Sequence, residues 1–370
     1  MQNRRVSYVR ITGAVIILIL IIFAGDYLVR SSAKKNNRNE NLTVTTEDPP
    51  QETTSVTVPA VGSFADGDGI VRPEIDEQKY KKLLKNAGEL GVGELVLVNK
   101  DYSYKFQDIS SVLVKMASKM DTKTYKLSYN THEVQQAVME PFNNMMADFF
   151  SAYNTRDLTI VTSHVPYADQ NAQYVVPADP ELLSGDLEMA PGYSEHHSGY
   201  ALDFKLVSDT GKISSFDATG SFAWISENSY KYGFVIRYPE GKEAVTGVKA
   251  NPAHFRYVGV PHSYIMHENG FTLEEYLNDL KKNVFGYEHL NYSLYGYEYE
   301  IYYVPAEDNE TEVPVPIDES YNVSGNNYDG YVVTICRKSS ESGSDAEVTG
   351  TVTSSPVVST PAVSTASAGM

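Results

Sequence analysis

The chain has 370 residues, a formal net charge of -18 at pH 7 and a pI near 4.9. Because nucleic-acid binding depends on clustered lysines and arginines, this acidic balance argues against a nucleic-acid partner. A single cysteine, Cys336, excludes an internal disulfide and a cysteine-rich metal site. The length and the low-complexity ends predict one main folded domain with appendages.

Residues 1–30 have the pattern of a membrane anchor or signal segment. From Ile11 to Gly25 the sequence is uncharged and strongly apolar, and a helix of that length covers roughly 22 Å at about 1.5 Å per residue. It is followed by a poor cleavage site and by no cysteine that could carry a lipid. We therefore expect an uncleaved, single-pass anchor in the cell membrane with the core outside the cytoplasm; a cleaved signal peptide is the alternative.

Two further segments lack the pattern of a folded core. Residues 31–65 are polar and rich in threonine and proline, which predicts a disordered linker. Residues 338–370 contain no aromatic residue and predict a disordered tail. The expected domains are therefore a core over residues 66–285 and a tyrosine-rich extension over residues 286–337.

Helices and strands interleave in the core. Short apolar runs at residues 94–100 and 158–165 predict strands, and residues 131–154 carry apolar side chains at helical spacing. Residues 272–282 open with a capping box of threonine and glutamate and predict a second helix. The pattern is that of an α+β fold.

The tyrosine-rich extension alternates with a period of two. The runs "YGYEYEIYYV" and "GYVVTIC" are separated by a segment rich in glycine and asparagine, which predicts an antiparallel accessory sheet. Its tyrosines could bind a sugar or a peptide, or they could form the half-buried face of an amphipathic sheet.

One carboxylate lies inside a predicted strand. In "YALDFKLV", Asp203 lies on the face opposite Leu202 and Phe204, and burying an unpaired carboxylate costs several kcal/mol. His196 precedes it in a loop, and His254 follows it in another strand-like run. Two imidazoles and a carboxylate match a zinc site that keeps one position for water, although composition alone also allows an accidental trio.

Four segments resemble a known family: "PGYSEHHSGYALDF", "WISENSYKYGFVIRYPEGKEAVTG", "HFRYVGVPH" and "GFTLEEYL", in this order. They are similar to the VanY-type D-alanyl-D-alanine carboxypeptidases of the LAS group of zinc peptidases. The resemblance implies an α+β core with a central antiparallel sheet and a peptidoglycan stem peptide as substrate. It also implies that Zn²⁺ is held by His196, Asp203 and His254, with Ser194 near the substrate carboxylate.

The sequence departs from the family pattern at two places. Where the family has its glutamate base, three residues before the last histidine, this chain has Asn251. The family's substrate arginine lies in a loop that corresponds to "SHVPY", residues 163–167, which has none. His164 in that loop is a candidate substrate-binding residue. Glu195 and His197 flank His196, and we expect them to point away from the water that His196 would face.

Three functions are compatible with the sequence. The protein could be a zinc D-alanyl-D-alanine carboxypeptidase with degraded activity. It could be a pseudoenzyme that keeps the metal and binds wall peptide or a protein partner. It could also be a structural, wall-associated domain without metal.

Overall fold

The computed structural model describes residues 76–173 and 190–339. The anchor and the linker that the sequence predicts lie outside this range. Of the predicted tail, residues 338–370, only the first two are described, and Lys338 is the last residue of a strand rather than part of a tail. Within the described residues, no helix combines the length and the apolar character that crossing a membrane requires.

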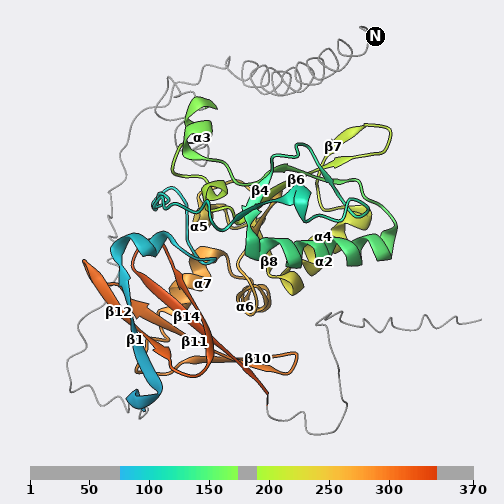
Figure 1. Cartoon of the computed structure of the whole chain (residues 1–370). Coiled ribbons are helices and arrows are strands. Elements are labelled where there is room, and N and C mark those ends of the chain that lie inside the picture. Colours follow the sequence, from blue (N-terminus) through green and yellow to red (C-terminus); the bar gives the residue numbers. More distant parts are fainter. Residues whose placement is uncertain (1–75, 174–189, 340–370) are drawn as a thin grey trace, which may run out of the picture. The chain divides into compact units, whose positions relative to one another are not determined.

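A six-stranded sheet forms the centre of the fold, with the order β3-β5-β6-β9-β8 and with β7 paired to β6 (Figure 1). Its pairs are antiparallel except for the parallel pair β3–β5. The predicted α+β fold with a central antiparallel sheet is confirmed, apart from this one parallel pair. The strands are β3 Lys126–Leu127, β5 Leu158–Thr162, β6 Ala201–Val207, β7 Ile213–Ser215, β8 Phe234–Tyr238 and β9 Asn251–Tyr257.

The helix α2, Gln136–Tyr153, covers one face of this sheet. Its buried residues recur every three or four positions and pack against Leu202, Phe204 and Phe255. It ends at Asn154, whose left-handed backbone (φ 50°) lets its N–H donate to the carbonyl of Phe150. The helix predicted over residues 131–154 is thus confirmed, although its first residues form β4, Glu133–Gln135, paired with β2, Leu113–Lys115.

Five shorter α-helices lie in the described part of the core. Of these, α7 begins with the predicted capping box, because Thr272 accepts from the N–H of Glu275 and the Glu275 carboxylate accepts from the N–H of Thr272. The bounds are α3 Tyr167–Gln173, α4 Ala223–Asn228, α5 Glu243–Thr246, α6 His262–Asn269 and α7 Leu273–Leu280.

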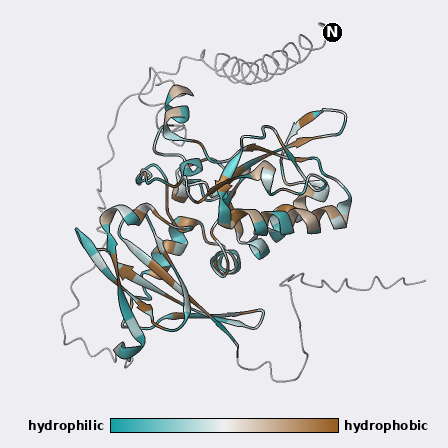
Figure 2. Ribbon diagram, in the orientation of Figure 1, coloured by the Kyte–Doolittle hydropathy of each residue, from teal (hydrophilic) through white to brown (hydrophobic). Residues whose placement is uncertain are grey.

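The tyrosine-rich extension is an antiparallel sheet with the order β10-β11-β14-β13, as the alternation predicts. Hydrophobic residues are frequent on the strands of both sheets (Figure 2). A separate pair joins β12 to β1, which lies more than two hundred residues earlier in the chain. The strands are β1 Tyr80–Asn86, β10 Leu290–Leu294, β11 Tyr297–Pro305, β12 Glu310–Pro316, β13 Ser320–Gly325 and β14 Gly330–Lys338.

The apolar run at residues 94–100 is not a strand, so this prediction is wrong. It is an irregular segment whose apolar side chains are buried, with Leu95 and Leu97 packed against α6, α7 and the extension. Its backbone bonds to the extension instead, since Leu97 N–H donates to the carbonyl of Asn326. A short apolar run marks burial equally well in a strand or in a loop.

His262 makes the stability of the fold sensitive to pH. Burial lowers the pKa of His262 to about 3, and the ring bonds to Tyr276 and Thr334. An unfolded histidine titrates near 6.5, so the folded state favours the neutral ring and its contribution is complete above pH 6.5. The free energy of unfolding should fall as the pH drops from 6.5 towards 3, by up to about 1.4 kcal/mol per pH unit. Urea unfolding at several pH values measures this slope.

The matched variants are His262→Asn and His267→Asn, because His267 is exposed on the same helix. We expect His262→Asn to flatten the pH dependence and His267→Asn to leave it unchanged. Equal slopes in wild type and His262→Asn would assign the acid sensitivity to other groups.

Candidate metal centre

Two neighbouring strands bring Asp203 and His254 together. In the antiparallel pair of β6 and β9, Asp203 lies directly opposite His254, so both side chains project from the same face of the sheet. The residues on either side of Asp203, Leu202 and Phe204, point into the core. Asp203 Oδ1 lies 2.8 Å from Nδ1 of His254. The alternation of the strand thus turns the carboxylate away from the apolar core, as the sequence predicts.

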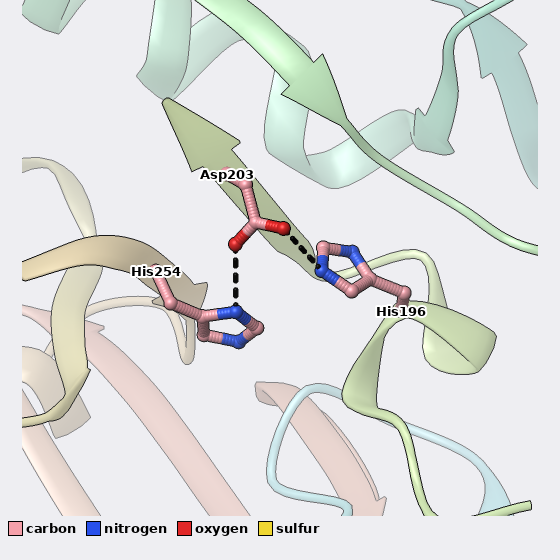
Figure 3. A group of neighbouring side chains, drawn as sticks. All are labelled: His196, Asp203 and His254. Carbon is pink, nitrogen blue, oxygen red and sulfur yellow. Dashed lines mark hydrogen bonds and ion pairs between the residues drawn. The ribbon is translucent and has the colours of Figure 1, made fainter. Parts of the chain in front are cut away.

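A short turn of 3₁₀ helix, η6 (Glu195–Ser198), supplies His196. Ser194 caps this turn because its hydroxyl accepts from the N–H of His196, and Gly199 ends it with a left-handed backbone (φ 74°). A Cβ at Gly199 would lie 3.0 Å from the side chain of Leu113, so space and conformation both favour glycine. His196 Nε2 lies 3.0 Å from Oδ2 of Asp203, and both histidine rings face this carboxylate (Figure 3).

The three side chains fit a zinc ion. Their ligand atoms all lie within 4.8 Å of one another. Tetrahedral Zn²⁺ with bonds near 2.0–2.2 Å holds its ligand atoms about 3.3 Å apart, so the nitrogen–oxygen distances of 2.8 and 3.0 Å need to open by only a few tenths of an ångström. That the trio binds zinc stays a prediction.

The charges around the trio favour a cation. Burial by itself would raise the pKa of Asp203, but the two histidines hold it well below its usual range. For His254, burial lowers the pKa, whereas Asp203 and then Glu195 raise it, and the result is about 9. Two carboxylates therefore act on one imidazole, and their negative potential also stabilises a bound metal ion.

Glu195 contacts the far side of His254. One oxygen, Oε2, lies 3.6 Å from His254 Nε2, the ring nitrogen that faces away from Asp203. The other, Oε1, accepts from Arg237 Nε at 2.7 Å and lies 2.9 Å from Arg256 Nη1. Burial raises the pKa of Glu195, but the two guanidinium groups outweigh burial and hold it well below its usual range. At 3.6 Å this contact is longer than a hydrogen bond, so Glu195 acts on the ring of His254 through its negative charge.

The buried charges continue into α7. Arg237 donates to both carboxylate oxygens of Glu274, at 2.9 and 2.6 Å. Arg256 donates to the backbone carbonyls of Glu94 and Val96, both at 2.8 Å. Sequence reasoning missed this network. The available signal was an arginine within each of two apolar strands, because a buried guanidinium needs a partner.

The other predicted site residues lie on the elements that carry the trio or on a segment bonded to them, and two of them make local hydrogen bonds. Ser194 caps η6, so its hydroxyl is used by the backbone. Asn251 is the first residue of β9, and its Oδ1 accepts from the N–H of Ala253. His164 is half-buried, and the next residue, Val165, donates its N–H to the carbonyl of His196. Burial and then the charges of His197 and His196 lower the pKa of His164 to about 4.

The structure also has a groove of about 510 Å³. Ser194, Asn251 and His164 do not line it. Its walls come from α2, the 3₁₀ turn Ser229–Tyr232, the end of β9, the segment before and within α6, and the β10–β11 hairpin. The groove therefore provides no substrate pocket for the candidate metal centre.

Comparisons with known proteins agree with this geometry. Residues 114–260 match the family model VanY, described as D-alanyl-D-alanine carboxypeptidase. A D-alanyl-D-alanine carboxypeptidase of Enterococcus faecium is 32% identical over 252 residues, which cover 66% of this chain and 75% of that protein. The chain belongs to the VanY family of D-alanyl-D-alanine carboxypeptidases, so the predicted family is confirmed.

A solved structure shows the same relationship. The vancomycin-resistance D,D-dipeptidase VanXYg, in complex with a D-Ala-D-Ala phosphinate analogue, is 31% identical with a TM-score of 0.59, and the match covers 70% of this chain and 99% of VanXYg. A mutant of the D,D-pentapeptidase VanY from a VanB-type cassette, solved with Zn(II), is 25% identical with a TM-score of 0.34; the match covers 50% of this chain and 99% of that one.

Proposed function

We propose that the protein is a zinc D-alanyl-D-alanine carboxypeptidase that acts on peptidoglycan stem peptides. The observation that carries the proposal is the convergence of His196, Asp203 and His254 on one point, with donor atoms at distances that suit Zn²⁺. Membership of the VanY family supports the reaction and the substrate class. The apolar stretch within residues 1–30 supports a single-pass membrane anchor. A peptidoglycan substrate would place the core outside the cytoplasm.

Each residue of the site has a distinct task in this proposal. His196, Asp203 and His254 would hold the metal, and Glu195 would orient the ring of His254 from behind. When bound, zinc supplies Lewis-acid chemistry, because it acidifies water and polarises a carbonyl group. Asn251 cannot accept a proton from water or return one to the leaving amine, since its amide has no basic lone pair at neutral pH.

Asn251 also favours a second candidate, a pseudoenzyme that binds zinc and wall peptide without cleaving it. Loss of a general base costs about 10² to 10⁴ in rate, so such a protein keeps its binding site and loses most of its turnover. Release of D-alanine from a model stem peptide separates the carboxypeptidase from the pseudoenzyme.

Zinc binding has its own test. We expect the full-length protein, purified without chelator and supplied with zinc, to contain about one ion per chain, and the substitution His254→Ala to abolish it. Added zinc should also raise the unfolding midpoint of wild type, because a ligand that binds only the folded state stabilises it. Elemental analysis and thermal unfolding measure both effects, and His267→Ala is the control. If the wild-type protein contains no zinc under these conditions, both zinc-binding functions are rejected and the structural, metal-free function is the one that remains.

A further inference from the structure

The loop of residues 163–167 lacks the arginine that the family resemblance implies. Between Arg156 and Lys205 the sequence contains no lysine or arginine, and Pro166 occupies the position of the family's arginine. The two arginines that reach the site, Arg237 and Arg256, are fully buried and bound to Glu195. A free carboxylate on the substrate therefore lacks its usual partner in this loop.

Two exposed aromatic rings meet at this loop, one from the loop itself and one from a distant segment of the chain. Tyr167 directly follows Pro166 and is 50% exposed, and Phe106 is 44% exposed. Their rings meet edge to face at 5.2 Å. We call these two residues the aromatic surface. Because aromatic rings of this exposure offer apolar contact area, they suit an uncharged part of a peptide.

The aromatic surface lies on His197, which adjoins the candidate ligand His196. The ring of Phe106 lies 4.9 Å from that of His197, and the ring of Tyr167 lies 6.4 Å from it. His197 is buried and fixed at both nitrogens, because Nδ1 donates to the carbonyl of Val165 at 2.7 Å and Nε2 accepts from the N–H of Gly192 at 3.0 Å. The imidazole is therefore neutral and serves as a rigid support for the two rings.

The tyrosine-rich extension holds the loop that carries Phe106. Asn327, in the turn between β13 and β14, donates from its side-chain amide to the carbonyls of Leu97 and Ser103, both at 2.8 Å. Its Oδ1 accepts from the N–H of Lys105 at 3.1 Å. The rings of Tyr328 and Tyr102 stack at 4.4 Å beside these bonds. All hydrogen-bonding groups of the Asn327 side chain are thus used to fix residues 97–105, next to Phe106.

We propose that the aromatic surface of Phe106 and Tyr167 is a substrate-contact site that takes an uncharged, apolar part of the peptide, and that Asn327 of the extension is its positioning residue. This proposal rests on the proposed function, since it concerns the peptide that the same site would bind. In this site, apolar contact takes the role that an ion pair between an arginine and the terminal carboxylate would otherwise have. The protein should consequently distinguish only weakly between a peptide with a free C-terminus and one whose C-terminus is an amide.

The test compares Phe106→Ala and Tyr167→Ala with Tyr153→Ala, a similarly exposed tyrosine at the end of α2. The probes are a pentapeptide ending in D-Ala-D-Ala and its C-terminal amide. Binding is read as KM where turnover is measurable and as Kd by calorimetry where it is not. We expect each of the two substitutions to raise this constant about tenfold, with unchanged zinc content and unfolding midpoint, and Tyr153→Ala to have no effect. Asn327→Asp, which lacks the two amide donors, should reproduce part of the effect.

For wild type, we expect the two peptides to differ less than about tenfold in this constant, because the ion pair is absent. A KM or Kd that is a hundredfold or more higher for the amide than for the free peptide would overturn the proposal. Cleavage of the pentapeptide with a KM that neither substitution changes would also overturn it. That second result would leave the carboxypeptidase function intact. Conversely, a protein without turnover whose peptide binding depends on both rings would reject the enzyme and keep the contact site. A wild type that binds neither peptide overturns both proposals.

Discussion

Replacing Glu195 by alanine is expected to lower the free energy of unfolding of the metal-free protein by about 3–5 kcal/mol. The carboxylate is fully buried and neutralises the equally buried Arg237 and Arg256. Glu274 remains beside Arg237 after the substitution. Arg256 loses its closest carboxylate and then keeps backbone carbonyls, the ring of Tyr200 and the electrostatic influence of Glu94. A buried charge that loses its partner pays the full cost of desolvation. Urea unfolding with chelator present measures the change.

Glu312→Ala is the matched control, because Glu312 pairs with Lys82 at 2.5 Å while both side chains stay exposed. An exposed pair contributes at most about 1 kcal/mol, so its loss should change stability little. Glu195→Gln keeps the size of the side chain and removes its charge, so it measures the contribution of the charge to stability. The same variant should weaken zinc binding about 10- to 100-fold in a chelator competition, since Glu195 contacts the outer nitrogen of His254. A Glu195→Ala protein within 1 kcal/mol of wild type would show that water or rearrangement compensates the two arginines.

Local sequence patterns predicted the elements that form the centre of the site. Alternation in residues 201–207 placed Asp203 opposite the core-facing residues, and in β6 it does face His196 and His254. Helical spacing predicted α2, and a capping box predicted the start of α7. In each case the information lies within a few neighbouring residues, which is the range over which periodicity and capping act.

The placement of Glu195 could not be predicted in this way. In an extended loop, adjacent side chains point apart, and on that assumption Glu195 would not share the surroundings of His196. The loop is a capped 3₁₀ turn, and it directs Glu195 inward to Arg237, Arg256 and His254. Its conformation depends on partners from β8 and β9, forty to sixty residues away in sequence.

Contacts between segments that are far apart in the sequence also could not be predicted. The lysine-rich β1 pairs with β12, and Leu95 and Leu97 pack against the extension although they lie in no strand. Strand pairing at such separation depends on the packing of the whole unit, which no local window contains. The same contacts, through Asn327, connect the extension to the aromatic surface.

The substitution Asn251→Glu is expected to raise the rate of D-alanine release by up to about 10² to 10⁴, the range of a general base. Asn251 is the first residue of β9 and lies three positions before the candidate ligand His254. A carboxylate there can take the proton from the attacking water and return it to the leaving amine. The rise should appear in kcat, measured by release of D-alanine at saturating peptide, and kcat should gain an acidic limb in its pH profile. Asn251→Gln, equal in size to glutamate but without a basic group, should show neither change.

A second substitution, Pro166→Arg, addresses the other departure from the family. An arginine in this loop can pair with the terminal carboxylate of the substrate, so the double variant should exceed Asn251→Glu in kcat/KM for the free peptide and not for its amide. The decisive comparison is with wild type. Turnover of about 1 to 10³ per second in wild type, unchanged by Asn251→Ala, would show that another residue acts as the base. Half-buried His164 would then be the first group to replace, because it adjoins the segment that bonds to His196, and the pseudoenzyme alternative would be rejected.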